Sequence, residues 1–138
     1  MQPTFVDGFK DPLILLARIL LSLLFIISGW LKLTGFSGTV AYISSLGAPL
    51  PTVAAAIAVV MELGGGIAIL LGLFTRPIAL LFVPFVLGTA LLGHQFWTMQ
   101  GMERTANEIN FYKNLGLIAA FMLLAVTGSG RFALDKGK

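Results

Sequence analysis

Two charged residues lie deep inside apolar stretches of this sequence and are the first candidates for chemistry. Glu62 is the sole charge within residues 50–74, and Arg18 interrupts the apolar run of residues 12–33. A carboxyl about 11 positions from either end of its run, roughly 16 Å along a helix, cannot extend to the water outside. It must be protonated, paired or in contact with a hydrated cavity. Glu62 and Arg18 are therefore candidates for proton handling or a buried ion pair. A structural carboxyl that only clamps helices, bonded to Arg18 or to a backbone carbonyl, is the alternative.

A second group of polar residues lies near the end of the third apolar run and the start of the fourth. His94 lies one helical turn before Trp97, and three asparagines recur at helical spacing beside a lysine. With Lys32 at a similar depth, these side chains predict an outward-facing polar pocket. Asparagines that hold helices together and an aromatic belt at the interface are the alternatives. The pocket candidates are Lys32, His94, Trp97, Asn107, Asn110, Lys113 and Asn114.

The first apolar run carries a polar stripe. Its members are spaced 4, 3, 4 and 3 residues apart, which places them on one face of a helix. The stripe is basic at both ends and small in the middle. Extension of the two cations to opposite lipid headgroups is the alternative explanation. The stripe consists of Arg18, Ser22, Phe25, Gly29 and Lys32.

The composition identifies the environment that these residues share. The chain has 138 residues, of which 57% are hydrophobic and 11% charged, whereas soluble proteins carry roughly 25% charged residues. The sequence has no Cys, which excludes disulfides and thiolate or iron–sulfur ligation. A single His and six acidic residues argue against a self-contained metal centre. The net charge of +3 comes from scattered basic residues, so nucleic acid is not an expected partner.

Four apolar runs are each long enough to cross the hydrocarbon layer as a helix, at about 20 residues per span. We predict spans over residues 12–33, 50–73, 77–97 and 109–128. They leave room only for short connections, so residues 1–138 form one all-α domain, an integral membrane four-helix bundle. A short interfacial helix is expected between spans one and two, where Phe36, Val40 and Ile43 share one side.

The remaining connections have their own predicted forms. Residues 72–77 predict a tight turn with Thr75 as the N-cap of the next helix and Pro77 in its first turn. Residues 98–108 predict a polar loop, and the tail beyond Gly130 is expected to be short and mobile. The basic residues favour cytoplasmic termini by five to three. The terminal side would hold Lys10, Arg76, Arg131, Lys136 and Lys138, and the other side Lys32, Arg104 and Lys113.

Several motifs together give the chain a family resemblance. It resembles the DoxX family of small membrane proteins in Arg18 with Gly29-x-x-Lys32, in Glu62 followed by glycines, and in Gly72-x-x-Thr75-Arg76. The stretches GFSGTVAYISSLGAP, IAVVME, LGTALLGH and INFYKN are similar to a short bacterial branch of that family. The resemblance implies a four-helix bundle in the bacterial inner membrane and a link to quinol-oxidising and redox-stress systems.

Three functions are compatible with these residues. The preferred hypothesis is a redox-accessory or quinone-interacting membrane subunit that is not an enzyme on its own. Quinone is then the implied cofactor, and a further redox or membrane subunit, or a second copy, is the implied partner besides the lipid bilayer. A small proton-coupled carrier or channel with Glu62 as its titrating group is the second hypothesis. The third is a non-catalytic assembly partner of another membrane complex.

Overall fold

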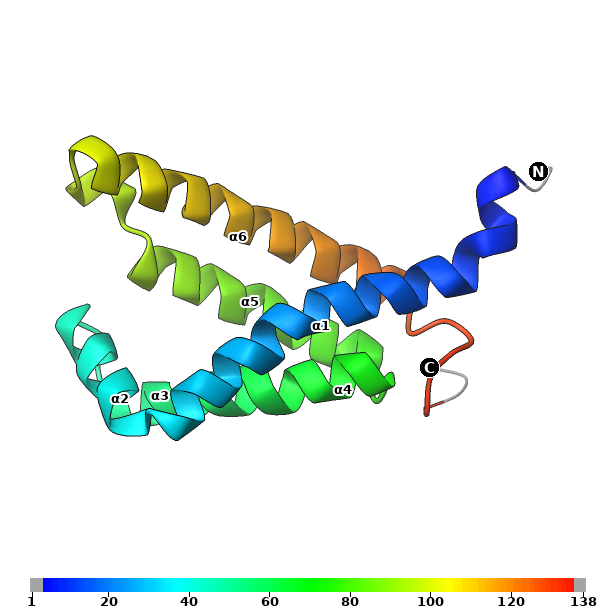
Figure 1. Cartoon of the computed structure of the whole chain (residues 1–138), viewed down its shortest axis with the longest axis horizontal. Coiled ribbons are helices and arrows are strands. Elements are labelled where there is room, and N and C mark those ends of the chain that lie inside the picture. The colour runs from blue at the N-terminus through cyan, green and yellow to red at the C-terminus, as the bar shows by residue number, and fades with distance from the viewer. Residues whose placement is uncertain (1–3, 136–138) are drawn as a thin grey trace.

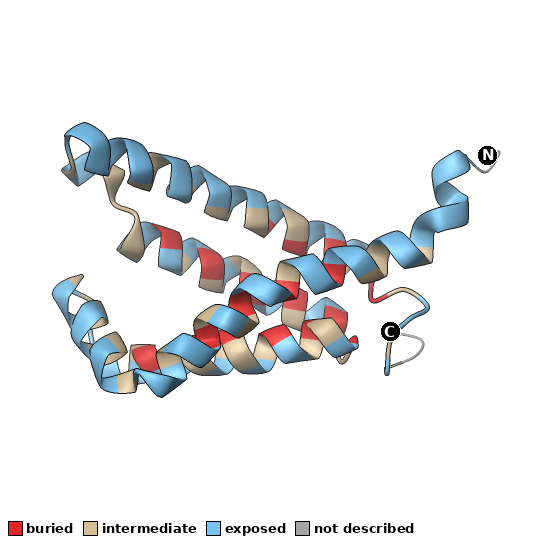
Figure 2. Ribbon diagram, in the orientation of Figure 1, coloured by how far each residue is buried: buried red, intermediate tan, exposed pale blue. Residues whose placement is uncertain are grey.

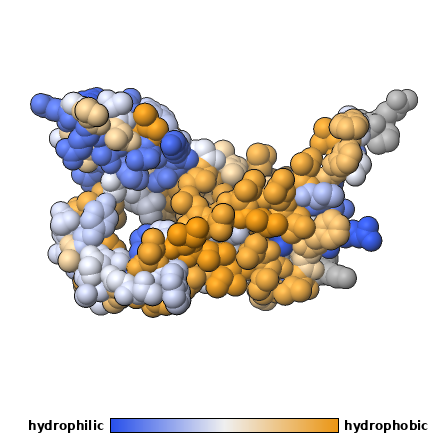
Figure 3. Space-filling model, in the orientation of Figure 1, coloured by the Kyte–Doolittle hydropathy of each residue, from blue (hydrophilic) through white to orange (hydrophobic). Residues whose placement is uncertain are grey.

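Four long helical stretches make up most of the chain in the computed structural model, which describes residues 4–135 (Figure 1). All four are long and apolar enough to cross a membrane: Phe5–Thr34, Pro51–Leu71, Thr75–Thr98 and Gly101–Thr127. The predicted all-α membrane bundle is confirmed. Many large apolar side chains of the spans are exposed on the surface of the bundle (Figures 2 and 3). This is expected of helices that face the hydrocarbon chains of lipids.

The first span begins with a 3-10 turn, η1 (Phe5–Phe9), and continues as α1 (Lys10–Thr34). The buried residues of α1 are Arg18, Ser22, Phe25 and Gly29, so the stripe recognised in the sequence is the face that packs. A short helix, α2 (Phe36–Ser45), follows after Gly35. This short helix was predicted, and it packs against the start of the second span.

The second span contains a change of helical pitch at Glu62. It runs through α3 (Pro51–Val59), the π-helical segment η2 (Val60–Gly65) and α4 (Gly66–Leu71). A π-helical turn is rare and is frequently found at functional sites. Glu62 is the buried residue of this segment.

The turn into the third span differs in one detail from the prediction. Gly72 takes the left-handed conformation at φ 73°, and Phe74 does so at φ 48°. Helix α5 (Thr75–Gly93) starts at Thr75, so Phe74 is the N-cap position and Thr75 is the first helical residue. Its hydroxyl is therefore not at the capping position, and the Thr75 side chain is buried in the bundle. Pro77 lies in the first turn as expected.

The predicted polar loop at residues 98–108 is wrong. Only residues 94–100 connect α5 to α6, with a 3-10 turn, η3 (Phe96–Thr98), inside them, and α6 (Gly101–Thr127) starts at Gly101. The polar residues Glu103 and Arg104 lie exposed on the first turns of α6. A helix can extend beyond its apolar part when its polar side chains remain in water, so polarity alone does not indicate a loop.

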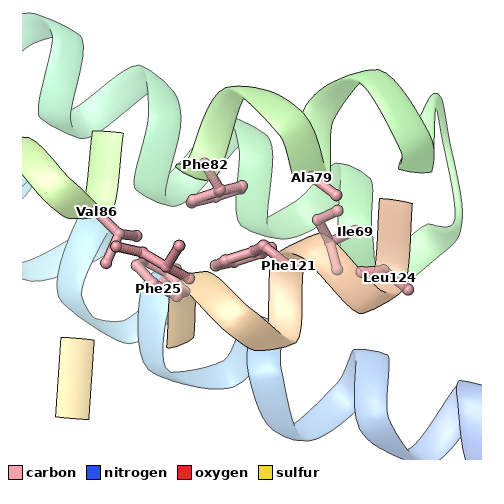
Figure 4. Packing of buried hydrophobic residues seen from close by; sticks show 8 residues of the cluster. Phe25, Ile69, Ala79, Phe82, Val86, Phe121 and Leu124 are labelled. Carbon is pink, nitrogen blue, oxygen red and sulfur yellow. The ribbon is translucent and has the colours of Figure 1, made fainter. Parts of the chain in front are cut away.

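An aromatic layer closes the middle of the bundle (Figure 4). Phe82 of α5 and Phe121 of α6 stack in parallel, with ring centroids 4.4 Å apart and planes 1° apart. Phe25 of α1 lies 4.9 Å from the Phe82 centroid and 5.5 Å from the Phe121 centroid. We call Phe25, Phe82 and Phe121 the aromatic layer. It joins α1 to the α5–α6 hairpin.

Candidate functional site

Arg18 lies on one side of the aromatic layer and is almost completely buried, with 1% of its surface exposed. Its Nε donates to the Ile69 carbonyl at 2.9 Å and its Nη2 to the Leu70 carbonyl at 2.7 Å. Its Nη1 donates to the carbonyls of Ser129 at 2.9 Å and Phe132 at 2.5 Å. The guanidinium therefore binds the carboxyl end of α4 and the segment after α6.

The expected Arg18–Glu62 ion pair is therefore a wrong prediction. The end of a helix presents unpaired carbonyls and a partial negative charge, so it stabilises a cation without a carboxylate. Ile69 and Leu70 are at that end of α4, whereas Glu62 lies about two turns earlier along the same span. Arg18 acts as a structural clamp here.

The segment after α6 is also not the loose tail that we expected. The Leu134 amide donates to the Leu71 carbonyl at 3.0 Å, and the Asp135 amide donates to the Gly72 carbonyl at 3.2 Å. The Arg131 amide donates to Asp11 Oδ1 at 3.1 Å. These contacts attach residues 128–135 to both α1 and the α4–α5 turn. Lys136 and Lys138, which entered the orientation argument, lie outside the described residues.

On the other side of the aromatic layer, Glu62 forms an ion pair with Lys32. Lys32 Nζ lies 3.1 Å from Glu62 Oε1 and 3.0 Å from Oε2, and it also donates to Ser28 Oγ at 2.6 Å. The Glu62 side chain is 7% exposed and that of Lys32 31%. Oε2 is buried and accepts no well-directed hydrogen bond from the described residues. Lys32 Nζ, 3.0 Å away, balances the charge of this oxygen.

Close contact between α1 and the π-helical segment brings this pair together. A Cβ atom on Gly29 would lie 2.5 Å from the Leu63 nitrogen, so only glycine allows this approach. Gly29 is three residues before Lys32, and Leu63 directly follows Glu62. The backbone contact therefore places both charged residues at the same level of the bundle.

The ion pair forms part of the wall of a cavity of about 540 Å³. Apolar side chains from α1, α2, α3, α5 and α6 make most of the wall. Figure 3 shows a hollow between the hydrophilic tip at the start of α6 and the paler surface of α2. Its polar or potentially polar lining residues are Ser28, Lys32, Tyr42, Glu62, Thr89, His94 and Asn114. A mostly apolar cavity with few polar groups is the usual form of a small-molecule site.

The structure divides the predicted outward-facing pocket into two groups. Lys32, His94 and Asn114 line the cavity. Asn107 contacts His94 directly, with its Oδ1 3.0 Å from His94 Nδ1, and its Nδ2 donates to the Glu103 carbonyl at 2.9 Å. This group therefore consists of residues at one site.

The other predicted pocket residues lie outside the cavity. Asn110 and Lys113 are exposed on α6, and Lys113 lines a separate shallow depression. Trp97 is about half exposed and packs its ring edge against Phe96 and Phe111. These aromatic contacts match the interfacial belt given as the alternative. Ser28 was not predicted from the sequence, although it lies one turn before Lys32 on the same helix.

Comparison with known proteins agrees with this architecture. The chain is 54% identical to "Inner membrane protein YphA" of Escherichia coli (strain K12) over 127 residues, which covers 92% of this chain and 91% of that protein. It is 41% identical to "Inner membrane protein YqjF" of the same organism over 130 residues, 92% of each chain. It is 30% identical to "Putative oxidoreductase CatD" of Bacillus subtilis (strain 168) over 128 residues, 90% of this chain and 88% of that protein.

No solved structure matches the chain. The inner-membrane relatives and the four apolar helices support a multi-pass protein of the bacterial inner membrane. The sequence model of the DoxX family matches residues 13–95, which is more than half of the chain and includes Arg18, Lys32, Glu62 and His94. The chain is a member of the DoxX family and belongs to its YphA-type branch.

Proposed function

We propose that this protein is a redox-accessory membrane subunit that binds a quinone or quinol in the cavity beside Glu62. The observation that carries the proposal is the Lys32–Glu62 ion pair in the wall of a mostly apolar cavity. Apolar walls suit a ring and the start of an isoprenoid chain, and the few polar groups suit the ring oxygens.

The side chains around the cavity fit this ligand chemically. The Glu62 carboxylate can accept a hydrogen bond or a proton from a ring hydroxyl, and Lys32 Nζ can balance the charge of the carboxylate. His94 lies in the same wall and has a second ring nitrogen besides the one that contacts Asn107. A quinone supplies two-electron, two-proton redox chemistry when bound.

Electron exchange would require a further protein in this proposal. The sequence has no Cys and one His, so it has neither cysteines for an iron–sulfur cluster nor two histidines for a haem. The family relationship and the printed description of CatD as "Putative oxidoreductase" support a redox context. A flavin- or haem-containing partner would exchange electrons with the bound ligand, while this chain binds it and handles protons.

The aromatic layer argues against a continuous proton track through the bundle. Phe25, Phe82 and Phe121 are buried and in mutual contact. They lie between the Arg18 clamp and the cavity, because Phe25 falls midway between Arg18 and Lys32 on α1. A carrier would have to separate these rings in each transport cycle. We therefore favour a ligand site that is open at one end.

Two glycines provide a matched test. Gly88 on α5 lines the cavity and Gly116 on α6 does not, yet neither has a heavy atom within 4 Å of a built Cβ. Because leucine favours helix by about 0.8 kcal/mol over glycine, neither Gly→Leu change is expected to unfold the protein. Gly88→Leu would fill the cavity and Gly116→Leu would not.

The assay is equilibrium binding of decylubiquinone and decylubiquinol to the purified protein in nanodiscs. We expect at least one of the two ligands to bind the wild type and Gly116→Leu with equal affinity. The same ligand should bind Gly88→Leu at least tenfold more weakly. Absence of binding to the wild type, or equal binding to both variants, would contradict the proposal. Proton flux in liposomes that disappears in Glu62→Gln would favour the carrier hypothesis instead.

A further inference from the structure

We infer that two copies of this chain associate side by side through α6, as a parallel dimer in which Glu108 of each copy pairs with Lys113 of the other. The inference goes beyond the proposed function and does not depend on it. It starts from the side of α6 that faces away from α5 and is exposed in the described structure (Figure 2). On the other side of the helix, Ile118, Phe121 and Leu124 are buried in the bundle.

The exposed side of α6 has a regular repeat. Eight exposed residues follow one another at alternating intervals of three and four positions along the helix, which is an average repeat of 3.5 residues. This repeat is typical of two helices that wind around each other, where the repeating residues form the shared contact line. We call these eight residues the α6 seam. They are Met102, Thr105, Ile109, Tyr112, Gly116, Ala119, Leu123 and Val126.

The composition of the α6 seam differs from that of a surface that faces only lipid. On α1, the exposed residues of the middle turns are large and apolar, as at Leu16, Leu20 and Leu23. The α6 seam instead has Gly116 and Ala119 at its centre, and a Cβ atom on Gly116 would have no heavy atom within 4 Å. Small residues allow two membrane helices to approach closely. The centre of the seam therefore has room for a second helix.

A shallow depression lies on the first half of the α6 seam. Its lining residues all belong to α6: Thr105, Glu108, Ile109, Tyr112 and Lys113. In a pair of coiled helices, each seam side chain enters a hole formed by four residues of the facing helix. Three successive seam residues and the flanking Glu108 give the depression the arrangement of such a hole. In a parallel dimer, Ile109 of the second copy lies at this level and fills the depression.

Two charges beside the depression favour the parallel arrangement. Among residues 4–135, the ion pair is Lys32–Glu62, and neither Glu108 nor Lys113 takes part in one. Side chains three or four residues apart are neighbours on one helix, but these two are five apart. Five residues separate the flanking positions that pair between two parallel coiled helices. Because copies inserted in the same orientation are parallel, a two-fold axis along the membrane normal forms this pair twice.

The α6 seam and the cavity occupy different faces of α6. Asn114 and Leu117 are the α6 residues that line the cavity, and neither belongs to the seam. Association through the seam therefore leaves the ligand site unchanged, and Gly116→Leu remains a control for ligand binding. Failure of either proposal leaves the other standing.

Disulfide cross-linking in native membranes tests the seam. The sequence has no Cys, so a single introduced Cys can form a disulfide within this protein only between two copies. We expect Thr105→Cys and Ile109→Cys to give linked dimers under mild oxidation, because residues beside a two-fold axis lie within the roughly 7 Å between Cα atoms that a disulfide spans. Arg104→Cys and Asn110→Cys are controls, exposed on α6 outside the seam. They should cross-link at least about fivefold less. Equal cross-linking at all four positions, or none at the seam positions, would overturn the inference and leave lipid as the cover of this face.

Charge reversal tests the pairing of Glu108 with Lys113. Two copies of different length, both with Thr105→Cys, are produced together, and the three kinds of linked dimer are separated by size. Random pairing makes half of the dimers mixed. When one copy carries Glu108→Lys and the other Lys113→Glu, opposite charges meet only in the mixed dimer. We expect its share to rise to about four fifths or more, because both ion pairs become repulsive in the unmixed dimers.

Two further combinations complete this test. A copy with Glu103→Lys is combined with an unchanged copy as the control, because Glu103 is exposed on α6 outside the seam. The mixed share should then stay at half. Reversal of both charges in one chain should restore cross-linking between identical copies. A mixed share of half with the two singly reversed copies would overturn the pairing and the parallel register that it defines.

Discussion

Gly29 of α1 lies against the backbone of Leu63, so close that a Cβ atom there would be 2.5 Å from the Leu63 nitrogen. This contact joins the first span to the π-helical segment that carries Glu62. It also sets the register in which Lys32 meets the carboxylate. The local geometry of the ion pair thus depends on a backbone contact one turn away.

Adding a methyl group at this contact should therefore damage both stability and the ion pair. For Gly29→Ala we expect the free energy of unfolding to fall by about 1–3 kcal/mol, because the backbones must separate. Equilibrium unfolding in mixed detergent and dodecyl sulfate micelles measures the change. Gly116→Ala, which has open space around its Cβ position, is the control and should be neutral or slightly stabilising. Equal stability of Gly29→Ala and the wild type would show that the helices can move apart freely.

Replacing Arg18 should release the C-terminal segment. Arg18→Met removes the donors to Ile69, Leu70, Ser129 and Phe132, and we expect a loss of at least about 3 kcal/mol. Arg18→Lys should restore little of the lost free energy of unfolding, because an ammonium lacks the planar, forked set of donors that reaches these carbonyls.

Limited trypsin digestion provides a local measurement of the same change. The Arg131 amide is bound to Asp11, so cleavage after this residue should be slow in the wild type and faster in Arg18→Met. Arg104 is exposed and distant in sequence, so cleavage there is the internal control. The same ratio of cleavage rates in both proteins would contradict the clamp.

A double-mutant cycle should identify the partner of Glu62. We expect Lys32→Met and Glu62→Gln to be non-additive by about 1–3 kcal/mol in free energy of unfolding, because each single change leaves the other group without its partner and Glu62 is buried. Arg18→Met combined with Glu62→Gln should be additive within about 0.5 kcal/mol. The opposite pattern would restore the ion pair first expected from the sequence.

The orientation in the membrane is open to a direct measurement. We propose that both termini are cytoplasmic, on the basis of the basic residues on that side, Arg76 and Arg131 among them. Green fluorescent protein fused to the C-terminus should fluoresce, and alkaline phosphatase fused there should be inactive. Phosphatase inserted in the 94–100 connection should be active. The reverse pattern would place the cavity on the cytoplasmic side.

The sequence predicts the helical framework and its packing face well, for a physical reason. Apolar length identifies a span, and 3.6-residue periodicity identified the stripe from Arg18 to Gly29 that α1 buries. The partner of Arg18 was not predictable in the same way. Its partners are backbone carbonyls, which every residue carries, and only the folded arrangement decides which helix end approaches.

The site was predicted in part for a related reason. Glu62, Lys32 and His94 stand out because polar residues are rare in such spans, and all of them line the cavity. Asn110 and Lys113 lie close in sequence to Asn107 and Asn114, yet both are exposed on α6 outside the cavity. A small rotation of α6 decides between these two faces, and nothing in the composition of the helix specifies it.

The Arg18 clamp has a consequence for how the protein is made. Arg18 is among the first residues to enter the membrane, but Ser129 and Phe132, which accept its hydrogen bonds, lie 111 and 114 residues later. During synthesis the guanidinium therefore lacks two of its four carbonyl partners until residues 129–132 leave the ribosome, even after Ile69 and Leu70 are in place. A chain that terminates after Thr127 would retain all four spans but leave this cation incompletely satisfied. The bundle is thus complete only once residues 129–132 have joined it, and a chain without them holds a buried cation that lacks two of its four carbonyl partners.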